Sequence, residues 1–200
     1  MADLIFDRQA VQAFRFIRCS LDEASGVASL VYAFDHGPEL TETIRFPNAP
    51  YVLDAPRREA VQHALRLLHL IAGVSYYKAA APSRIDIEGH AIDADTAALM
   101  TELYENGLGE FAYRNGMVLR GKIRFPAAAV GATPAPALGL RKHALVAIGG
   151  GKDSLVSIEA LRKAGVAQTV TWVGSSPLIK ACAERTGLPM LNIGRSLAPE

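Results

Sequence analysis

Three short segments near the start of the chain have the residue pattern of strands. Residues 14–19, 26–34 and 41–46 are rich in Val, Ile, Phe, Tyr and Thr. Clusters of turn-forming residues at 22–26 and 35–38 separate them, as is typical of strands joined by tight connections. The pattern predicts a three-stranded antiparallel meander.

Two helices are predicted after the meander. From Arg57 to about Gly73, apolar residues recur every three or four positions, with Pro56 before the stripe, which is typical of an amphipathic helix. A second helix is predicted from Asp93 or Asp95 to residue 106, with an aspartate as its N-cap and a glycine after its last turn.

Residues 126–142 break these patterns with three prolines, two glycines and six alanines. A long surface loop is one interpretation, but a linker is favoured because Pro-rich segments prefer extended, semi-rigid conformations. We therefore expect an N-terminal α+β domain over residues 1–125, a linker over 126–142 and an α/β domain over 143–200.

After the linker, the spacing of apolar residues along the sequence changes. Residues 144–148 are a continuous apolar run, typical of a strand buried on both faces of a parallel sheet. The following segments predict a helix over 153–164, a strand over 168–173, a helix over 177–186 and a strand over 189–193. This is a βαβαβ unit, so the fold class is α/β with an α+β N-terminal part.

The predicted parallel sheet is incomplete. Open nucleotide-binding sheets of this type usually have five or six strands, and here there are three. The third strand, 189–193, is expected to leave an exposed edge through which chains could associate. We therefore expect the sequence to be the front part of a longer protein and a poor catalyst alone.

The clearest chemical signal is Gly-Gly-Gly-Lys-Asp-Ser at residues 149–154, between the apolar strand and its helix. Backbone amides and the helix dipole favour an anion there, while Lys152 adds charge and Ser154 a hydroxyl. A Walker loop is excluded because Asp153 follows the Gly-Lys pair. A dinucleotide fingerprint is excluded because Ser154 replaces its third glycine or alanine. A glycine turn without a ligand is the plain alternative.

The segment resembles the Ser-Gly-Gly-x-Asp-Ser loop of the ATP pyrophosphatases of the adenine nucleotide alpha-hydrolase group. Gly150, Gly151, Asp153 and Ser154 match that loop, and Gly149 replaces its first serine. Loss of that serine removes one possible phosphate contact.

Three segments in order, residues 68–82, 102–116 and 147–154, are similar to the MurL family. These are the UDP-N-acetylmuramoyl-L-alanyl-L-glutamate epimerases of bacterial peptidoglycan synthesis. The similarity covers nearly the whole chain from about residue 13, and family members continue well beyond residue 200.

This resemblance implies an ATP- and Mg²⁺-dependent inversion of the terminal L-glutamate of the UDP-muramoyl dipeptide. Adenylation would neutralise the carboxylate beside the α-carbon, so that a base can remove the α-proton and an acid return it on the other face. Asp153 is the implied metal ligand. The implied nucleotide-binding residues are Gly149, Gly150, Gly151, Lys152, Asp153, Ser154 and Val173.

Several polar residues are candidates for proton transfer or substrate binding. They are Tyr76, Tyr77, Lys78, Glu105 and Arg114. Aromatic packing and a solvated helix end explain the same residues equally well. His69 lies on the apolar stripe and is expected to be a hydrogen-bonded core histidine.

Composition narrows the function classes. Half the residues are hydrophobic and the formal net charge is +1, which excludes a largely disordered chain and disfavours a general nucleic-acid binder. Cys19 and Cys182 form no metal-binding motif, and no membrane or export signal is visible, so a cytoplasmic protein is expected. The alternatives to the epimerase are a carboxylate-amidating ligase and a non-catalytic nucleotide sensor. The oligomeric state is left open.

Overall fold

The predicted meander is present in the computed structural model, which describes residues 7–129, 131 and 136–199. Strands β1 (Ala13–Asp22), β2 (Val27–Phe34) and β3 (Leu40–Arg45) pair antiparallel in chain order. Alternate side chains of β1 and β2 enter the main core, as expected for a sheet with one covered face.

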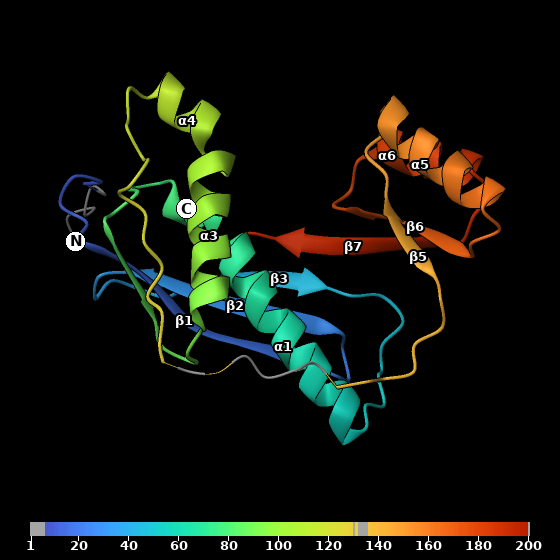
Figure 1. Cartoon of the computed structure of the whole chain (residues 1–200), viewed down its shortest axis with the longest axis horizontal. Helices are drawn as coiled ribbons and strands as arrows, with labels where there is room; N and C mark the ends of the chain where they lie inside the picture. Colours follow the sequence, from blue (N-terminus) through green and yellow to red (C-terminus); the bar gives the residue numbers. More distant parts are fainter. Residues whose placement is uncertain (1–6, 130, 132–135, 200) are drawn as a thin grey trace.

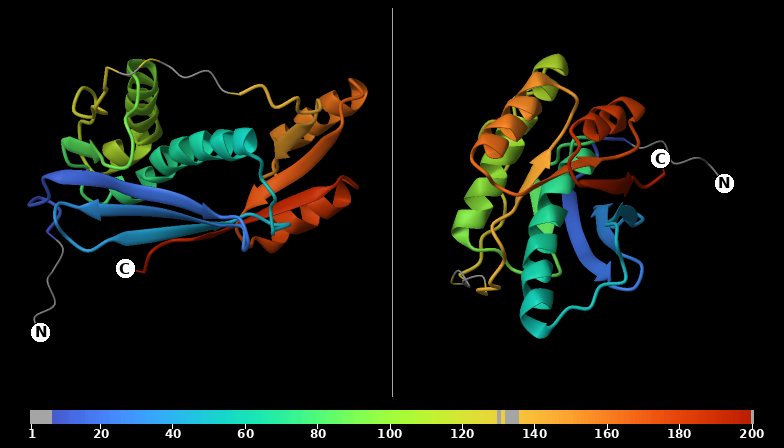
Figure 2. Two further views of the ribbon diagram at one scale, coloured as in Figure 1. Left: turned by 90° about the horizontal axis from the view of Figure 1, so that it is seen from below. Right: turned by 90° about the vertical axis from the view of Figure 1, so that its right-hand side faces the viewer.

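Helices cover one face of this meander (Figures 1 and 2). They are α1 (Ala55–Ala72), α2 (Val74–Tyr77), α3 (Ala94–Gly107) and α4 (Gly109–Arg114). The predictions of α1 and α3 are confirmed to within about two residues at each end. Both begin on an aspartate N-cap: Asp54 accepts from the Arg57 amide at 2.9 Å and Asp93 from the Thr96 amide at 2.7 Å.

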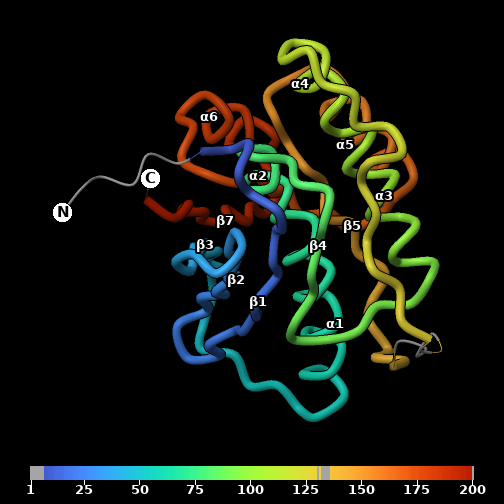
Figure 3. Tube along the Cα trace, turned by 90° about the vertical axis from the view of Figure 1, so that its left-hand side faces the viewer, coloured from blue at the N-terminus to red at the C-terminus, as the bar shows by residue number. Residues whose placement is uncertain are grey.

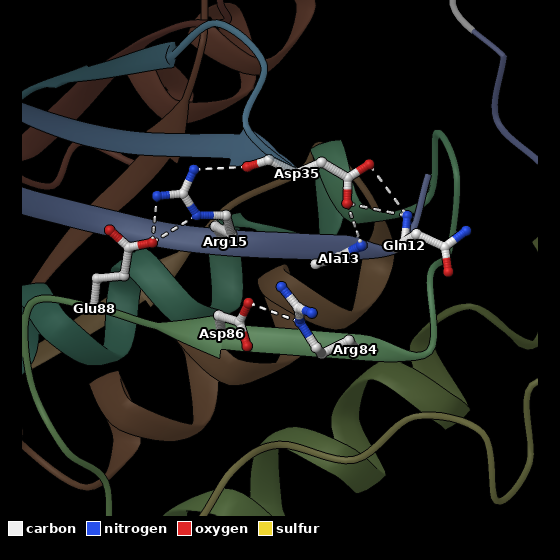
Figure 4. A network of polar contacts seen from close by, with 7 residues as sticks. All are labelled: Gln12, Ala13, Arg15, Asp35, Arg84, Asp86 and Glu88. Atoms are coloured by element: carbon white, nitrogen blue, oxygen red, sulfur yellow. Dashed lines mark hydrogen bonds and ion pairs between the residues drawn. The ribbon is translucent and has the colours of Figure 1, made fainter. Parts of the chain in front are cut away.

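Strand β4 (Arg84–Ile87) was not predicted, and it lies parallel to β1 at one end of the sheet. Figure 4 shows the polar contacts that hold it. Arg15 forms an ion pair with Glu88 at 2.6 Å and donates to the main-chain oxygen of Asp35 at 2.6 Å. The Asp35 carboxylate accepts from the Ala13 amide at 2.8 Å, which fixes the start of β1.

The second half of the chain forms the predicted βαβαβ unit. Its elements are β5 (Ala144–Ala147), α5 (Lys152–Lys163), β6 (Gln168–Val173), α6 (Pro177–Arg185) and β7 (Met190–Ser196). The three strands pair in parallel, with β6 in the middle. A second, smaller core lies between these strands and the two helices.

The third parallel strand is longer than predicted, and the expectation that it leaves a free edge is wrong for its extension beyond residue 193. Strand β7 pairs with β6 through residues 190–193 and then continues, so that residues 194–196 pair antiparallel with β3. The result is one seven-stranded sheet in the order β4-β1-β2-β3-β7-β6-β5, which can be followed from β4 to β7 in Figure 3. The terminal strands of the sheet are therefore β4 and β5.

The division into two domains stays a prediction. The two cores do separate by sequence, since the buried residues of the main core lie between 14 and 125 and those of the second between 146 and 183. Part of the proposed linker, residues 130 and 132–135, lies outside the described residues. Within the described part of the chain, no helix combines the length and the hydropathy needed to cross a membrane.

A buried ion pair supports the junction of β3 and β7. The Glu42 carboxylate on β3 is fully buried and accepts from Arg195 on β7 at 2.6 Å. Arg195 also donates to the Ser75 hydroxyl at 2.9 Å, and the Ala198 amide donates to the Tyr76 hydroxyl at 2.9 Å. These contacts tie the last strand to the end of the helical layer.

Replacing Arg195 with alanine is expected to destabilise the fold strongly, because it leaves the Glu42 carboxylate buried without a cation. Loss of one partner of a buried pair costs about 3 kcal/mol or more. Arg162→Ala is the control, since its partner Glu159 is solvent-exposed and such pairs contribute roughly 0–1 kcal/mol. Urea unfolding of both variants checks this. Equal losses of unfolding free energy would contradict a structural role for the buried pair.

Candidate functional site

The glycine loop connects β5 to α5 at the carboxyl end of the parallel strands. The strand pairing continues to Ile148, whose amide donates to the Thr171 carbonyl at 2.9 Å. Gly150 has a φ of +82°, in the left-handed region that favours glycine, and Gly151 is the extended N-cap of α5. The predicted strand–loop–helix arrangement is thus present.

The N-terminus of α5 lacks a side-chain cap. Asp54, Asp93 and Ser176 cap α1, α3 and α6 with a side-chain oxygen, whereas Gly151 has no side chain to offer. The first-turn amides of α5 therefore have no side-chain cap to accept their hydrogen bonds in the part of the chain that the structure describes. Such amides and the positive end of the helix dipole make an anion-binding position.

The polar side chains of the loop lie at this helix start. Lys152 and Asp153 are the first two residues of α5, and both are exposed. Ser154 donates from its hydroxyl to the Gly151 carbonyl at 2.9 Å. The first turn of α5, which holds the uncapped amides, thus carries a cation, a carboxylate and a hydroxyl.

The strand register brings Val173 to the same place. Ala147 pairs with Thr171, so Gly149 and Val173 each lie two residues further along neighbouring strands. Val173 is 54% exposed, and α6 begins four residues after it. The indole N–H of neighbouring Trp172 is buried and has no hydrogen-bond partner within the described residues. The structure therefore gathers all the predicted nucleotide-binding residues at one end of the parallel strands.

The three consecutive residues Tyr76, Tyr77 and Lys78 have different surroundings. Tyr77 is buried in the main core, where its hydroxyl donates to the Pro82 carbonyl at 2.9 Å and burial raises its pKa to about 12. Tyr76 is partly buried and stacks on Tyr32 with ring centroids 4.8 Å apart. Burial also raises the pKa of Tyr76. The contacts of Tyr77 are those of a core residue.

Lys78 lines an open cavity of about 390 Å³ between the segment before β1 and the segment after α2. Its lining residues are Arg8, Gln9, Val11, Lys78, Ala79, Ala80, Ala81, Pro82 and Met117. The charged groups among them are Lys78 and Arg8, both exposed cations. This combination favours an anionic ligand.

Glu105 and Arg114 lie on α3 and α4. Glu105 accepts from the Gly121 amide at 2.5 Å, and Arg114 forms an exposed ion pair with Glu110 at 2.8 Å. These contacts lie within residues 105–121 and none of them reaches the glycine loop. The structure does not join these two candidates to the loop.

His69 is a core histidine, as predicted. It is 1% exposed, its Nε2 lies 3.0 Å from the Val31 carbonyl, and its own carbonyl accepts from the Tyr32 hydroxyl at 3.1 Å. Burial lowers the pKa of His69 from its ordinary 6.5 to about 4. The imidazole is therefore neutral at pH 7.

The lowered pKa of His69 predicts a loss of stability in mild acid. Below about pH 6.5 the unfolded chain binds a proton that the folded chain does not take up until about pH 4. The unfolding free energy should therefore fall by about 3 kcal/mol between pH 7 and pH 4. Urea titrations of the parent and of His69→Gln check this, because glutamine retains a donor for Val31 but does not titrate. An equally steep pH dependence in the variant would contradict the assignment.

Sequence reasoning missed Glu42 and Arg195, the buried pair between β3 and β7. Glu42 lies in a predicted strand, where successive side chains alternate between solvent and core. Its position therefore gave only a weak indication that its carboxylate is buried. Its partner lies 153 residues away, so no local pattern connects them.

The fold and the loop together define a mixed α/β protein in which a glycine loop joins a parallel strand to an uncapped helix. The family model described as MurL N-terminal domain matches residues 5–200, and the chain belongs to this family.

Three similar proteins carry the name UDP-N-acetyl-alpha-D-muramoyl-L-alanyl-L-glutamate epimerase. The protein from Xanthomonas oryzae pv. oryzae is 68% identical over 98% of this chain, and that from Micromonospora sp. is 40% identical over 94%. The protein from Salinispora tropica is 37% identical over 94%. This chain spans only 42–43% of the length of these relatives. No solved structure matches it.

Proposed function

We propose that this chain supplies the ATP-binding loop of a longer enzyme that inverts the terminal L-glutamate of UDP-N-acetylmuramoyl-L-alanyl-L-glutamate. The uncapped start of α5 behind the glycine loop, with Lys152 beside it, is the observation that carries the proposal. The names of the relatives support the substrate and the reaction, and favour an epimerase over an amidating ligase or a nucleotide sensor.

The residues present fit a nucleoside triphosphate and a metal ion. Apart from the adjacent residues, no atom of the described chain lies within 4 Å of the position that a Cβ would take at Gly149 or Gly151, so a ligand can approach the backbone closely. Lys152 supplies positive charge for the phosphates. Asp153 would bind Mg²⁺, which usually shares one or two carboxylates with substrate phosphates and water.

ATP would serve to change the acidity of the substrate. Removing the α-proton beside a free carboxylate places a second negative charge next to the first. A bond from the carboxylate oxygen to the α-phosphorus, with release of pyrophosphate, leaves a neutral acyl group whose carbonyl can share the carbanion's charge. A base then removes the proton, an acid returns one on the other face, and water releases AMP.

Residues outside the loop are candidates for binding the UDP-muramoyl dipeptide. Lys78 and Arg8 at the open cavity provide charge for an anionic part of the substrate, whereas Tyr77 is occupied in the core. Tyr76, Glu105 and Arg114 stay as candidates for binding or proton transfer. Free thiols at Cys19 and Cys182 suit a reducing compartment, so we place the reaction in the cytoplasm.

Product analysis tests the proposed function. The longer protein is incubated with the UDP-muramoyl dipeptide, ATP and Mg²⁺, with and without ammonia. We expect D-glutamate in the dipeptide, together with AMP and pyrophosphate and without consumption of ammonia. Amide formation would indicate the ligase instead, and nucleotide binding without any product would indicate the sensor.

A further inference from the structure

The parallel strands are covered by helices on one face only. Side chains from β5 and β6, Val146 and Val170 among them, pack with Ile158 of α5 and Ala183 of α6 in the second core. Gln168 on this face also donates to the Ile158 carbonyl at 3.1 Å. Both helices therefore lie on the same side, whereas parallel sheets are normally covered on both.

The opposite face is apolar and open. Leu145 is 58% exposed, and Val173 at the end of the next strand is also largely exposed. The two threonines between them have internal partners: Thr169 is bonded to the His143 imidazole at 2.8 Å, and Thr171 donates to the Leu191 carbonyl at 2.8 Å. With those hydroxyls paired, this face is suited to apolar packing.

Strand β5 also ends the sheet. The amides of Ala144 and Ile148 donate toward β6, at 2.8 and 2.9 Å. Because donors alternate along a strand, the amides of Leu145 and Ala147 point away from β6. No strand among the described residues pairs with that side of β5.

The length of the relatives indicates what covers this surface. More than half of each relative lies outside the region that this chain matches, and the matching family model is that of an N-terminal domain. A strand would pair with the free edge of β5, and at least one amphipathic helix would cover the apolar face beside it. The covering segment must therefore supply both. A second copy of this chain would pair its own β5 edge but has no unpartnered helix to offer in the part described.

We propose that the C-terminal part of the longer polypeptide adds a parallel strand to β5 and covers the open face with helices. A right-handed crossover in this direction places its helix on the face opposite α5 and α6. The glycine loop follows β5, which would then lie between β6 on one side and the added strand on the other. The connections of these neighbouring strands run to opposite faces of the sheet, and open α/β sheets bind ligands at such a position. The proposal does not depend on ATP binding.

Amide hydrogen exchange tests the proposed strand. The protein to use is this chain continued by the C-terminal part of the Xanthomonas oryzae relative, without nucleotide. We expect the amides of Leu145 and Ala147 to be protected at least 100-fold, and the amide of Ile148, whose partner is on β6, to be protected as well. Rapid exchange of Leu145 and Ala147 beside a protected Ile148 would overturn the proposal. So would protection that appears only in a dimer, as judged by sedimentation.

A lysine substitution tests the covered face separately. Leu145→Lys is expected to lower the melting temperature of the longer protein by about 5 °C or more, because the charge would be buried. Leu178→Lys on α6 is the control, since Leu178 is also exposed here but lies outside the proposed contact. Equal, small shifts for both variants would overturn the covering of this face.

Discussion

When the longer protein acts on the UDP-muramoyl dipeptide in D₂O, we expect one deuterium at the glutamate α-carbon of the product. We expect this label only when ATP and Mg²⁺ are present. Without adenylation the carboxylate keeps its negative charge, and the α-proton is too weakly acidic to be removed. Mass spectrometry of the recovered dipeptide, with ATP omitted in a parallel reaction, measures the label. Labelling that persists without ATP would exclude the adenylate route and leave the glycine loop without a catalytic role.

Variants of the glycine loop, assayed in the same D₂O reaction, test whether deuterium labelling depends on the loop. Lys152→Ala removes charge at the phosphates and Asp153→Ala removes the proposed metal ligand, so each should lower labelling and pyrophosphate release together, by about 100-fold. Lys163→Ala, at the far end of α5, is the matched control and should retain both. Loss of labelling with normal pyrophosphate release would instead place Lys152 or Asp153 in proton transfer.

Much of the fold could be predicted because its signals are local. The meander, α1, α3 and the alternation of strands and helices after residue 143 follow from hydrophobic period and from caps such as Asp54. Strand β4 was missed because its four residues alternate charged and apolar side chains over too short a span to show a period, whereas the equally short β5 lies in a continuous apolar run. The last residues of β7 were missed because their pairing with β3 depends on a segment about 150 positions away, which no window of sequence contains.

The candidate site divides in the same way. The glycine loop is contiguous in sequence, so its position between β5 and α5 could be predicted. The surroundings of Tyr76, Tyr77 and Lys78 could not, because these adjacent residues face different parts of the fold. Only tertiary structure separates Tyr77, bonded to Pro82 in the core, from Lys78 at the open cavity.

Replacing Gly150 with valine is expected to lower ATP affinity at least 100-fold while the protein stays folded. Gly150 has a φ of +82°, which valine adopts only with strain. In the proposed site, a side chain at this position would also crowd the phosphates at the adjacent amides. The strain should cost about 1–2 kcal/mol of unfolding free energy. Calorimetric titration with ATP and circular dichroism measure the two effects.

Gly165→Val separates strain from ligand exclusion. Gly165 follows α5 with a φ of +65°. Apart from the adjacent residues, a Cβ there would meet no atom of the described chain within 4 Å, and one at Gly150 would meet only the Cys182 Sγ, in ordinary contact at 3.7 Å. The substitution therefore carries a comparable conformational cost far from the amides at the helix start. We expect it to lower stability about as much as Gly150→Val and to leave ATP affinity unchanged. An equal loss of affinity in both variants would mean that strain alone weakens binding. Unchanged ATP affinity in Gly150→Val would show that the loop does not bind the nucleotide. Gly150 is the loop position where a left-handed backbone and a proposed phosphate contact coincide, so its substitution is the most disruptive test of the loop.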